Sequence, residues 1–174
     1  MPSAEQPVLI IVMGVSGTGK SSVAKALAQH YRYRYLDGDD FHSAQAKKLM
    51  AEGTPLDDTL RAPWVDNICT QLRQHAASAT SCTLAFSGLR RDHRQRLRQL
   101  PFRQLFIHLN GDKPTIAQRM SKRQNHFMPT SLLDSQLASL QAPNAEPDII
   151  EVSIAPPLPE VIASCIKHID ATLG

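Results

Sequence analysis

Apolar positions along the chain occur in five short runs that are separated by segments of helical length. The first run, residues 8–13, is continuous and rich in β-branched residues, which is typical of a strand buried on both faces. Further runs occupy residues 35–36, 82–86, 105–109 and 149–154. Helices are predicted over residues 20–31, 43–51, 62–77, 90–99, 113–122, 131–141 and 159–172. The alternation predicts an α/β fold, a three-layer α/β/α sandwich around a central parallel sheet of about five strands.

Two connections between these elements are long and partly polar. They cover residues 37–61 and 122–130, and long irregular connections in compact α/β domains are usually substrate lobes or lids. The 174 residues contain no internal repeat and no low-complexity linker. We therefore expect a single domain over residues 1–174, with an inserted substrate lobe at about 40–62 and a lid at about 120–131.

A glycine-rich segment directly follows the first apolar run. Residues 14–21, GVSGTGKS, match the phosphate-loop pattern G-x-x-x-x-G-K-[ST] without a mismatch. In this motif, backbone N–H groups surround phosphate oxygens at the positive end of a helix. The lysine reaches the β- and γ-phosphates, and the hydroxyl of the last residue binds Mg²⁺. The pattern predicts ATP and Mg²⁺ as cofactors, bound by Gly14, Val15, Ser16, Gly17, Thr18, Gly19, Lys20, Ser21 and Ser22.

The phosphate loop does not by itself define a reaction, because kinases, GTPases and motor ATPases share it. The sequence contains no N-K-x-D motif for reading guanine, and no apolar strand that ends in Asp-Glu. A short chain with a phosphate loop and inserted lobes favours a small-molecule kinase.

Two carboxylates follow the second apolar run, at the sheet edge where α/β proteins bind ligands. Asp37 and Asp39 are two positions apart, so they would share a face in extended backbone. One could hold a metal-bound water while the other accepts a proton from an attacking hydroxyl. Asp40 is interpreted as part of a solvated turn. For His42, a hydrogen bond to substrate and a structural contact are equally compatible with the sequence.

The formal charge of +3 is unevenly distributed. Residues 90–103 hold six arginines and one acidic residue, a net +5, so the other 160 residues carry −2. This distribution argues against a uniformly cationic nucleic-acid binder. Arg90, Arg94 and Arg98 would lie on one stripe of a helix, and arginine suits bidentate contacts to carboxylate or phosphate. We expect the excess charge to bind an anionic substrate, with Arg96 and Arg98 instead on a solvated basic face.

Two further arginines lie near the end of a predicted helix. Arg119 and Arg123 could neutralise the charge that develops on a transferred phosphoryl group. Alternatively, they are exposed cations that interact favourably with the helix dipole.

The cysteine pattern and hydropathy bear on location. The three cysteines, Cys69, Cys82 and Cys165, are widely spaced and do not form a CxxC motif. We therefore expect them to be small core residues, and we expect the protein to be in the reducing cytoplasm. The longest early apolar run has six residues, too few for a membrane span or a signal peptide.

Several motifs together resemble those of a known family. They are M-G-V-S-G-T-G-K-S (13–21), L-D-G-D-D-F-H (36–42), G-T-P-L-D-D (53–58), R-A-P-W (61–64), S-G-L-R-R (87–91), R-M-S-K-R-Q-N-H-F-M-P (119–129) and S-Q-L-A-S-L-Q-A-P (135–143). Over nearly its whole length the chain resembles the bacterial-type gluconokinases, relatives of shikimate kinase among the P-loop kinases. The resemblance implies transfer of the ATP γ-phosphoryl group to the 6-hydroxyl of D-gluconate, with Mg²⁺.

The resemblance also implies roles for individual residues. Catalysis would involve Lys20, Asp39 and Arg123, with Asp37 and Ser21 near the metal and Arg119 at the nucleotide. Contacts to the sugar acid would come from Asp39, His42, Arg61, Arg90, Arg94 and His126. A homodimer would also be in keeping with the family, and neither nucleic acid nor membrane is expected as a partner.

The sequence departs from the family's usual residues at five positions: Ala46, Leu49, Leu60, His93 and Asn125. The usual residues there are Asn, Lys, an acidic residue, Tyr and Gly, respectively. Two alternatives therefore stay open. One is a kinase for another small hydroxy acid, such as shikimate or a related aldonate. The other is a nucleotide-binding regulator whose arginines bind nucleic acid.

Overall fold

A computed structural model describes residues 6–15, 17–54, 56, 58–122, 132–141 and 146–173. Five strands are present: β1 (Val8–Met13), β2 (Arg34–Asp37), β3 (Cys82–Ala85), β4 (Arg103–Asn110) and β5 (Ile149–Ser153). The helices are α1 (Lys20–Tyr31), the 3₁₀ helix η1 (Gly38–Phe41), α2 (Ala44–Ala51), α3 (Asp58–Ala77), α4 (Arg91–Arg98), α5 (Lys113–Lys122), α6 (Leu132–Ser139) and α7 (Leu158–Leu173).

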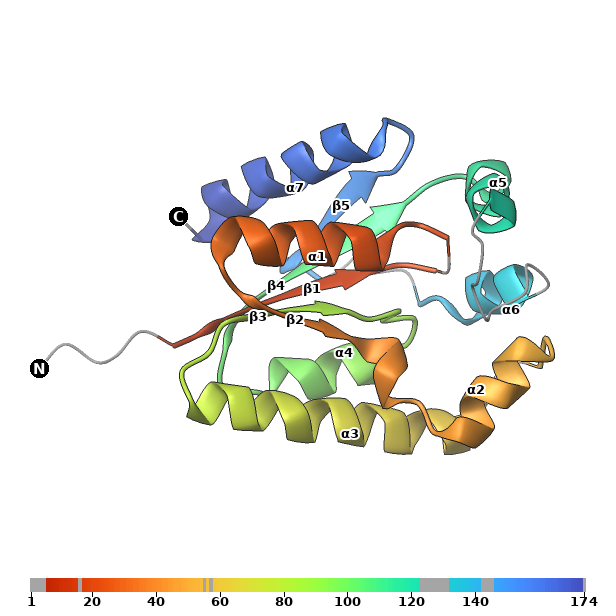
Figure 1. Cartoon of the computed structure of the whole chain (residues 1–174), viewed down its shortest axis with the longest axis horizontal. Coiled ribbons are helices and arrows are strands. Elements are labelled where there is room, and N and C mark those ends of the chain that lie inside the picture. Colours follow the sequence, from red (N-terminus) through yellow and green to blue (C-terminus); the bar gives the residue numbers. More distant parts are fainter. Residues whose placement is uncertain are drawn as a thin grey trace, which may run out of the picture.

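The five strands form one parallel sheet in the order β2-β3-β1-β4-β5. Helices α1 and α7 cover one face, and α3 and α4 cover the other (Figure 1). The expected three-layer α/β/α sandwich around a parallel sheet is therefore confirmed. Strand β1 is central, and every residue from Leu9 to Met13 is fully buried because both faces are covered.

The alternation of side chains along the strands creates two apolar cores. Ile10 and Val12 of β1 face the core shared with α1 and α7. Leu9, Ile11 and Met13 face the core shared with α3 and α4. The three cysteines are free, buried thiols in these cores, as the sequence indicated.

The element boundaries agree closely with the sequence pattern, with one informative exception. Helix α3 was expected to begin at about residue 62. It begins instead at Asp58, so Pro63 lies inside the helix, where it cannot donate a backbone hydrogen bond.

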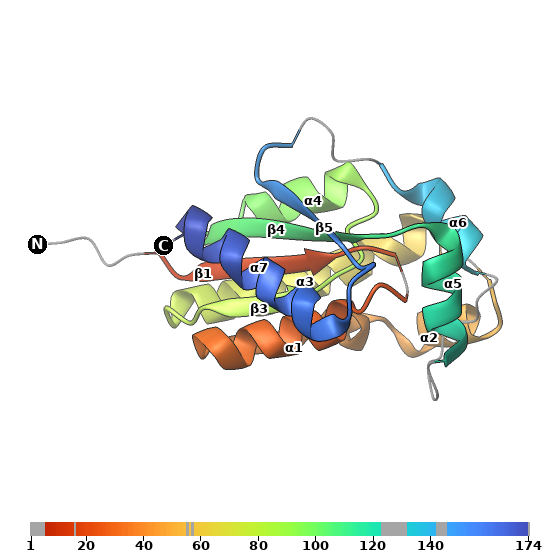
Figure 2. The ribbon, with the colours of Figure 1, turned by 90° about the horizontal axis from the view of Figure 1, so that it is seen from above.

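Helices α2, α5 and α6 lie beyond the carboxyl ends of the strands (Figures 1 and 2). The expected substrate lobe at about 40–62 corresponds to η1, α2 and the start of α3. Most of the expected lid, residues 123–131, lies outside the described residues. Within the part of the chain that is described, no helix is long and apolar enough to cross a membrane.

Candidate active site

The phosphate loop connects β1 to α1 at the carboxyl end of the central strand. Gly14 has φ of +150°, and a Cβ there would lie 2.8 Å from both the carbonyl oxygen of Leu109 and Oγ1 of Thr18. Gly19 has φ of +90° and caps α1 in the left-handed conformation. Glycine at these positions therefore allows the tight turn that the motif requires.

Side chains within the loop hold its backbone in place. The hydroxyl of Thr18 donates to the carbonyl oxygen of Val15 at 2.8 Å, and Nζ of Lys20 donates to the same oxygen at 3.2 Å. The Lys20 ammonium is thus folded over the loop at the amino end of α1. This end of the helix favours anions, because its backbone N–H groups and dipole are positive.

Asp37, the last residue of β2, contacts the last residue of the phosphate-loop motif directly. The hydroxyl of Ser21, the second residue of α1, donates to Oδ2 of Asp37 at 2.9 Å. Strand β2 lies at the sheet edge, and α1 packs across β1, β3 and β2. The sequence suggested both residues as metal ligands, and the structure brings them together.

The donor set at this point suits magnesium. Mg²⁺ prefers oxygen ligands and usually retains several waters beside one or two carboxylates and substrate phosphates. The hydroxyl of Ser21 and the carboxylate of Asp37 supply such oxygens beside Lys20. The residues present therefore fit the metal that the phosphate-loop chemistry implies.

The relation between Asp37 and Asp39 differs from the expected one. The chain leaves the extended conformation after Asp37 and forms the 3₁₀ helix η1. The Asp37 carboxylate caps this helix by accepting the backbone N–H of Asp39 at 3.0 Å. The expectation that the two side chains share the face of an extended strand is therefore wrong. Asp39 instead lies in the first turn of η1, directly beside Asp37.

His42 continues this line of polar groups away from the phosphate loop. Its Nε2 lies 4.0 Å from Oδ1 of Asp39, and its ring stacks on Trp64 of α3 with centroids 4.2 Å apart. Indole Nε1 of Trp64 donates to the carbonyl oxygen of Gly38 at 2.7 Å. The His42 side chain is almost fully buried, and its Nδ1 has no hydrogen-bond partner among the described residues.

Burial and nearby positive charge keep this imidazole neutral. Desolvation and, to a smaller extent, the positive charges of Lys47 and Arg61 together lower the pKa of His42 to about 4. Asp37 has the opposite effect. Arg61, at the start of α3, therefore acts electrostatically on the same site as His42. A neutral His42 can both donate and accept a hydrogen bond.

Three departures from the family pattern lie together in the substrate lobe. Ala46 is buried with Met50 and Leu56 in a small apolar cluster, and Leu49 and Leu60 pack against it. Apolar residues at these three positions therefore join α2 to the start of α3 by packing.

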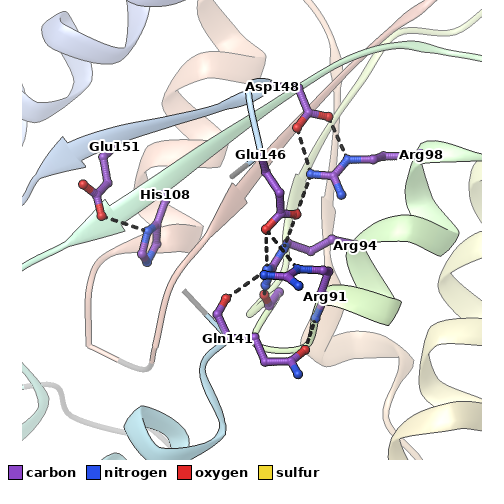
Figure 3. A network of polar contacts seen from close by, with 9 residues as sticks. Arg91, Arg94, Arg98, His108, Gln141, Glu146, Asp148 and Glu151 are labelled. Carbon is purple, nitrogen blue, oxygen red and sulfur yellow. Dashed lines mark hydrogen bonds and ion pairs between the residues drawn. The ribbon is translucent and has the colours of Figure 1, made fainter. Parts of the chain in front are cut away.

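The arginine-rich segment has a different role from the expected one (Figure 3). Arg94 is fully buried, and its guanidinium makes two hydrogen bonds to Glu146, at 3.0 and 2.7 Å. It also donates to the carbonyl oxygens of Gly88, at 2.6 Å, and Gln141, at 2.9 Å. In this structure Arg94 is closed to a sugar acid, which corrects its assignment as a substrate contact.

Arg98 also departs from the expected role. It was assigned to a solvated face, yet its side chain is 18% exposed and makes two hydrogen bonds of 2.8 Å to Asp148. It also lies 2.8 Å from Glu146. Two of the arginines in residues 90–103, Arg94 and Arg98, are thus paired with acidic residues just before β5. Arg96, paired with Asp66 at the surface, agrees with the expected exposed face.

Arg90 retains a position compatible with ligand binding. It is the N-cap of α4, and its side chain is 35% exposed. Together with Arg91, Asp92, Gln95 and Gln141 it lines an open hollow of about 420 Å³.

Several expected site residues cannot be placed. Ser16, Arg123 and His126 lie outside the described residues, and the same holds for the side chain of Arg119 in α5. Ser22 is exposed on α1 next to Ser21.

Two residues of this site were not predicted from the sequence. Trp64 holds η1 and His42 in place, and its only sequence signal was its place in the R-A-P-W motif. Tyr35 donates to Oδ2 of Asp37 at 2.9 Å. Its position two residues before Asp37 on a strand would have placed both side chains on one face.

Fold and site together define the class of protein. A parallel sheet carries a phosphate loop after its central strand, and an acidic turn after β2 faces that loop beside an inserted lobe. This is the arrangement of a P-loop kinase that acts on a small molecule. A family model described as AAA domain matches residues 9–143.

The comparison with known proteins narrows the class to a family. The chain is 37% identical to a gluconokinase of Gluconobacter oxydans, over 95% of this chain and 93% of the relative. It is 37% identical to the thermoresistant gluconokinase of Escherichia coli, over 92% and 93% of the two chains. A gluconokinase structure from Sinorhizobium meliloti superposes with a TM-score of 0.83 at 36% identity, covering 97% of this chain and 94% of that one. The chain belongs to the gluconokinase family.

Proposed function

We propose that the protein transfers the γ-phosphoryl group of ATP to the 6-hydroxyl of D-gluconate, giving 6-phosphogluconate and ADP. The observation that carries this proposal is the row of polar groups that runs from Ser21 through Asp37 and Asp39 to His42, whose Nε2 lies 4.0 Å from the Asp39 carboxylate. It joins the phosphate loop to the substrate lobe, where an acceptor hydroxyl has to meet the transferred group.

Each end of this line has a distinct task. Lys20 and the backbone N–H groups of the phosphate loop bind and orient the phosphates. Ser21 and Asp37 would hold Mg²⁺, which would neutralise part of the negative charge of the phosphates. Asp39 orients the acceptor hydroxyl and accepts its proton. Its side chain is 39% exposed, so the carboxylate is accessible to a ligand.

The acceptor is a polyhydroxylated carboxylate, and it requires cationic and neutral hydrogen-bonding groups. We assign Arg61 and Arg90 to its carboxylate and hydroxyls, because an arginine fork pairs with carboxylates in bidentate fashion. We also assign His42, which is neutral at physiological pH, to the acceptor lobe as a hydrogen-bonding group for a hydroxyl. We further propose that His126 contacts the acceptor, that Arg119 contacts the nucleotide, and that Arg123 neutralises charge on the transferred group.

An acceptor-panel assay tests this proposal. ADP release by the purified protein is measured with ATP and Mg²⁺ in the presence of D-gluconate, other aldonates or shikimate, with Lys20→Ala as the inactive control. D-gluconate should accelerate ADP release far above the rate with water alone, and the product should be phosphorylated at the 6-position. No acceleration by gluconate, or a stronger one by shikimate, would overturn the assignment.

The organisation of the chain is part of the same proposal. Residues 1–174 would act as one kinase domain, with residues 40–62 as the acceptor lobe and residues 120–131 as the lid. A homodimer, to be tested by sedimentation, and a cytoplasmic location remain predictions. Nucleic-acid binding is disfavoured because Arg94 and Arg98 are neutralised by Glu146 and Asp148.

A further inference from the structure

Tyr35 lies beneath the metal ligands. Its hydroxyl donates to Oδ2 of Asp37 at 2.9 Å, and the Ser21 hydroxyl donates to the same oxygen, also at 2.9 Å. The other carboxylate oxygen, Oδ1, accepts the backbone N–H of Asp39 at 3.0 Å. Three donors from three different elements or turns thus hold one carboxylate.

The lone pairs of this carboxylate limit what else it can bind. Each carboxylate oxygen offers about two acceptor sites. The two hydroxyls occupy both sites of Oδ2, whereas Oδ1 accepts one hydrogen bond from the described residues, the N–H of Asp39, and so has a second acceptor site for a further ligand. The Tyr35 hydroxyl therefore determines which oxygen of Asp37 faces the phosphate loop and which site remains for a metal or its water.

The tyrosine ring is itself held in place. It packs against the core shared with α1, and Nζ of Lys25 lies 5.5 Å from the ring centroid. The Tyr35 hydroxyl is the donor in its hydrogen bond to Asp37, because a carboxylate can only accept.

We propose that Tyr35 is a positioning residue for magnesium: it orients the Asp37 carboxylate and thereby sets the affinity of the nucleotide site for the metal. The inference rests on the proposed function, because it takes Asp37 and Ser21 as the groups that hold the metal. Removal of a residue that hydrogen-bonds to a metal-binding carboxylate commonly lowers metal affinity or activity by roughly 10- to 100-fold.

Calorimetric titration with ADP, in EDTA and in Mg²⁺, tests the proposal without any reaction. The variant is Tyr35→Phe, which keeps the ring and removes the hydroxyl. Magnesium should strengthen ADP binding about 10-fold less in Tyr35→Phe than in the wild type. The metal-free affinity for ADP should be unchanged. In turnover assays, the Mg²⁺ concentration for half-maximal rate should rise, while kcat should recover at saturating Mg²⁺.

Tyr31→Phe is a matched control, because it removes the same type of hydrogen bond at a distant place. The Tyr31 hydroxyl donates to Asp170 of α7 at 2.7 Å. This variant should leave the magnesium effect unchanged. An unaltered magnesium effect in Tyr35→Phe overturns the proposal, and so does a loss of metal-free ADP binding, which would indicate general support of the loop.

The outcomes also separate this inference from the proposed function. Failure of gluconate as an acceptor would overturn the substrate assignment and leave the ADP titrations interpretable. If magnesium did not change ADP binding by the wild type, the proposed metal site would be overturned, and the proposed role of Tyr35 would be overturned with it.

Discussion

Arg94 and Glu146 lie 52 positions apart in the sequence and form a doubly hydrogen-bonded ion pair in the interior of the protein. The Arg94 side chain has no exposed surface, and that of Glu146 is 8% exposed. The remaining contacts of Arg94 reach the carbonyl oxygens of Gly88 and Gln141. One side chain therefore joins α4, the turn after β3 and the chain on both sides of residues 142–145.

Glu146→Gln should destabilise the protein by about 3 kcal/mol, because it leaves a buried guanidinium without its counter-charge. Asp66→Asn is the matched control, since Asp66 pairs with Arg96 at the surface. It should cost less than about 1 kcal/mol. Urea denaturation of both variants measures the difference, and equal effects would mean that the buried pair contributes no more than a surface pair.

Lys20→Ala should lower kcat by orders of magnitude while the thermal midpoint is retained, because Lys20 is half-exposed and contributes charge to bound phosphate. Lys167→Ala, an exposed lysine on α7, should leave kcat unchanged. Comparable turnover in the two variants would show that the phosphate-loop lysine has been assigned wrongly.

Asp39→Asn should depress kcat more than it alters the KM for ATP, because the proposed role of Asp39 is to orient the acceptor hydroxyl and not to bind the nucleotide. The neighbouring Asp40 is exposed, and Asp40→Asn should have little effect on either constant. Steady-state kinetics with varied ATP and gluconate distinguish these cases. A defect confined to ATP affinity would indicate that Asp39 is a metal ligand and does not orient the acceptor.

Stability should fall between about pH 6.5 and pH 4 because of His42. Its pKa is lowered to about 4 in the folded protein, whereas an unfolded histidine titrates at about 6.5. The unfolded chain therefore takes up a proton first as the pH falls, and unfolding becomes easier by up to about 1.4 kcal/mol per pH unit. Above that window both states are neutral, and the full stability is present.

The experiment compares free energies of unfolding across this pH range for the wild type and His42→Gln. The variant should show a shallower dependence on pH, whatever its stability at neutral pH. Parallel curves would mean that His42 titrates normally in the folded state.

The part of the site that could be predicted is the part encoded by neighbouring residues. The phosphate loop follows from contiguous residues between a buried strand and a helix, and residues 20–31 form the expected helix. The turn at Asp39 was harder, because the 3₁₀ helix depends on the Asp37 carboxylate capping it. A local pattern cannot show whether a strand ends before or after such a cap.

Roles set by distant partners could not be predicted. The spacing of Arg94 and Arg98 correctly placed them on one helix stripe, but it could not show what that stripe faces. Glu146 and Asp148, which bind them, lie about fifty positions away. An arginine that binds a substrate carboxylate and one that binds a protein carboxylate look the same in sequence, because the chemistry of the partner is identical.

Trp64 gives the protein a built-in optical probe. It is the only tryptophan in the sequence, and it stacks on His42 while its indole N–H is bound to Gly38. Its fluorescence therefore reports from the floor of the acceptor lobe alone. A sugar acid that binds at the proposed acceptor site beside His42 should therefore change this emission, without a label and without turnover.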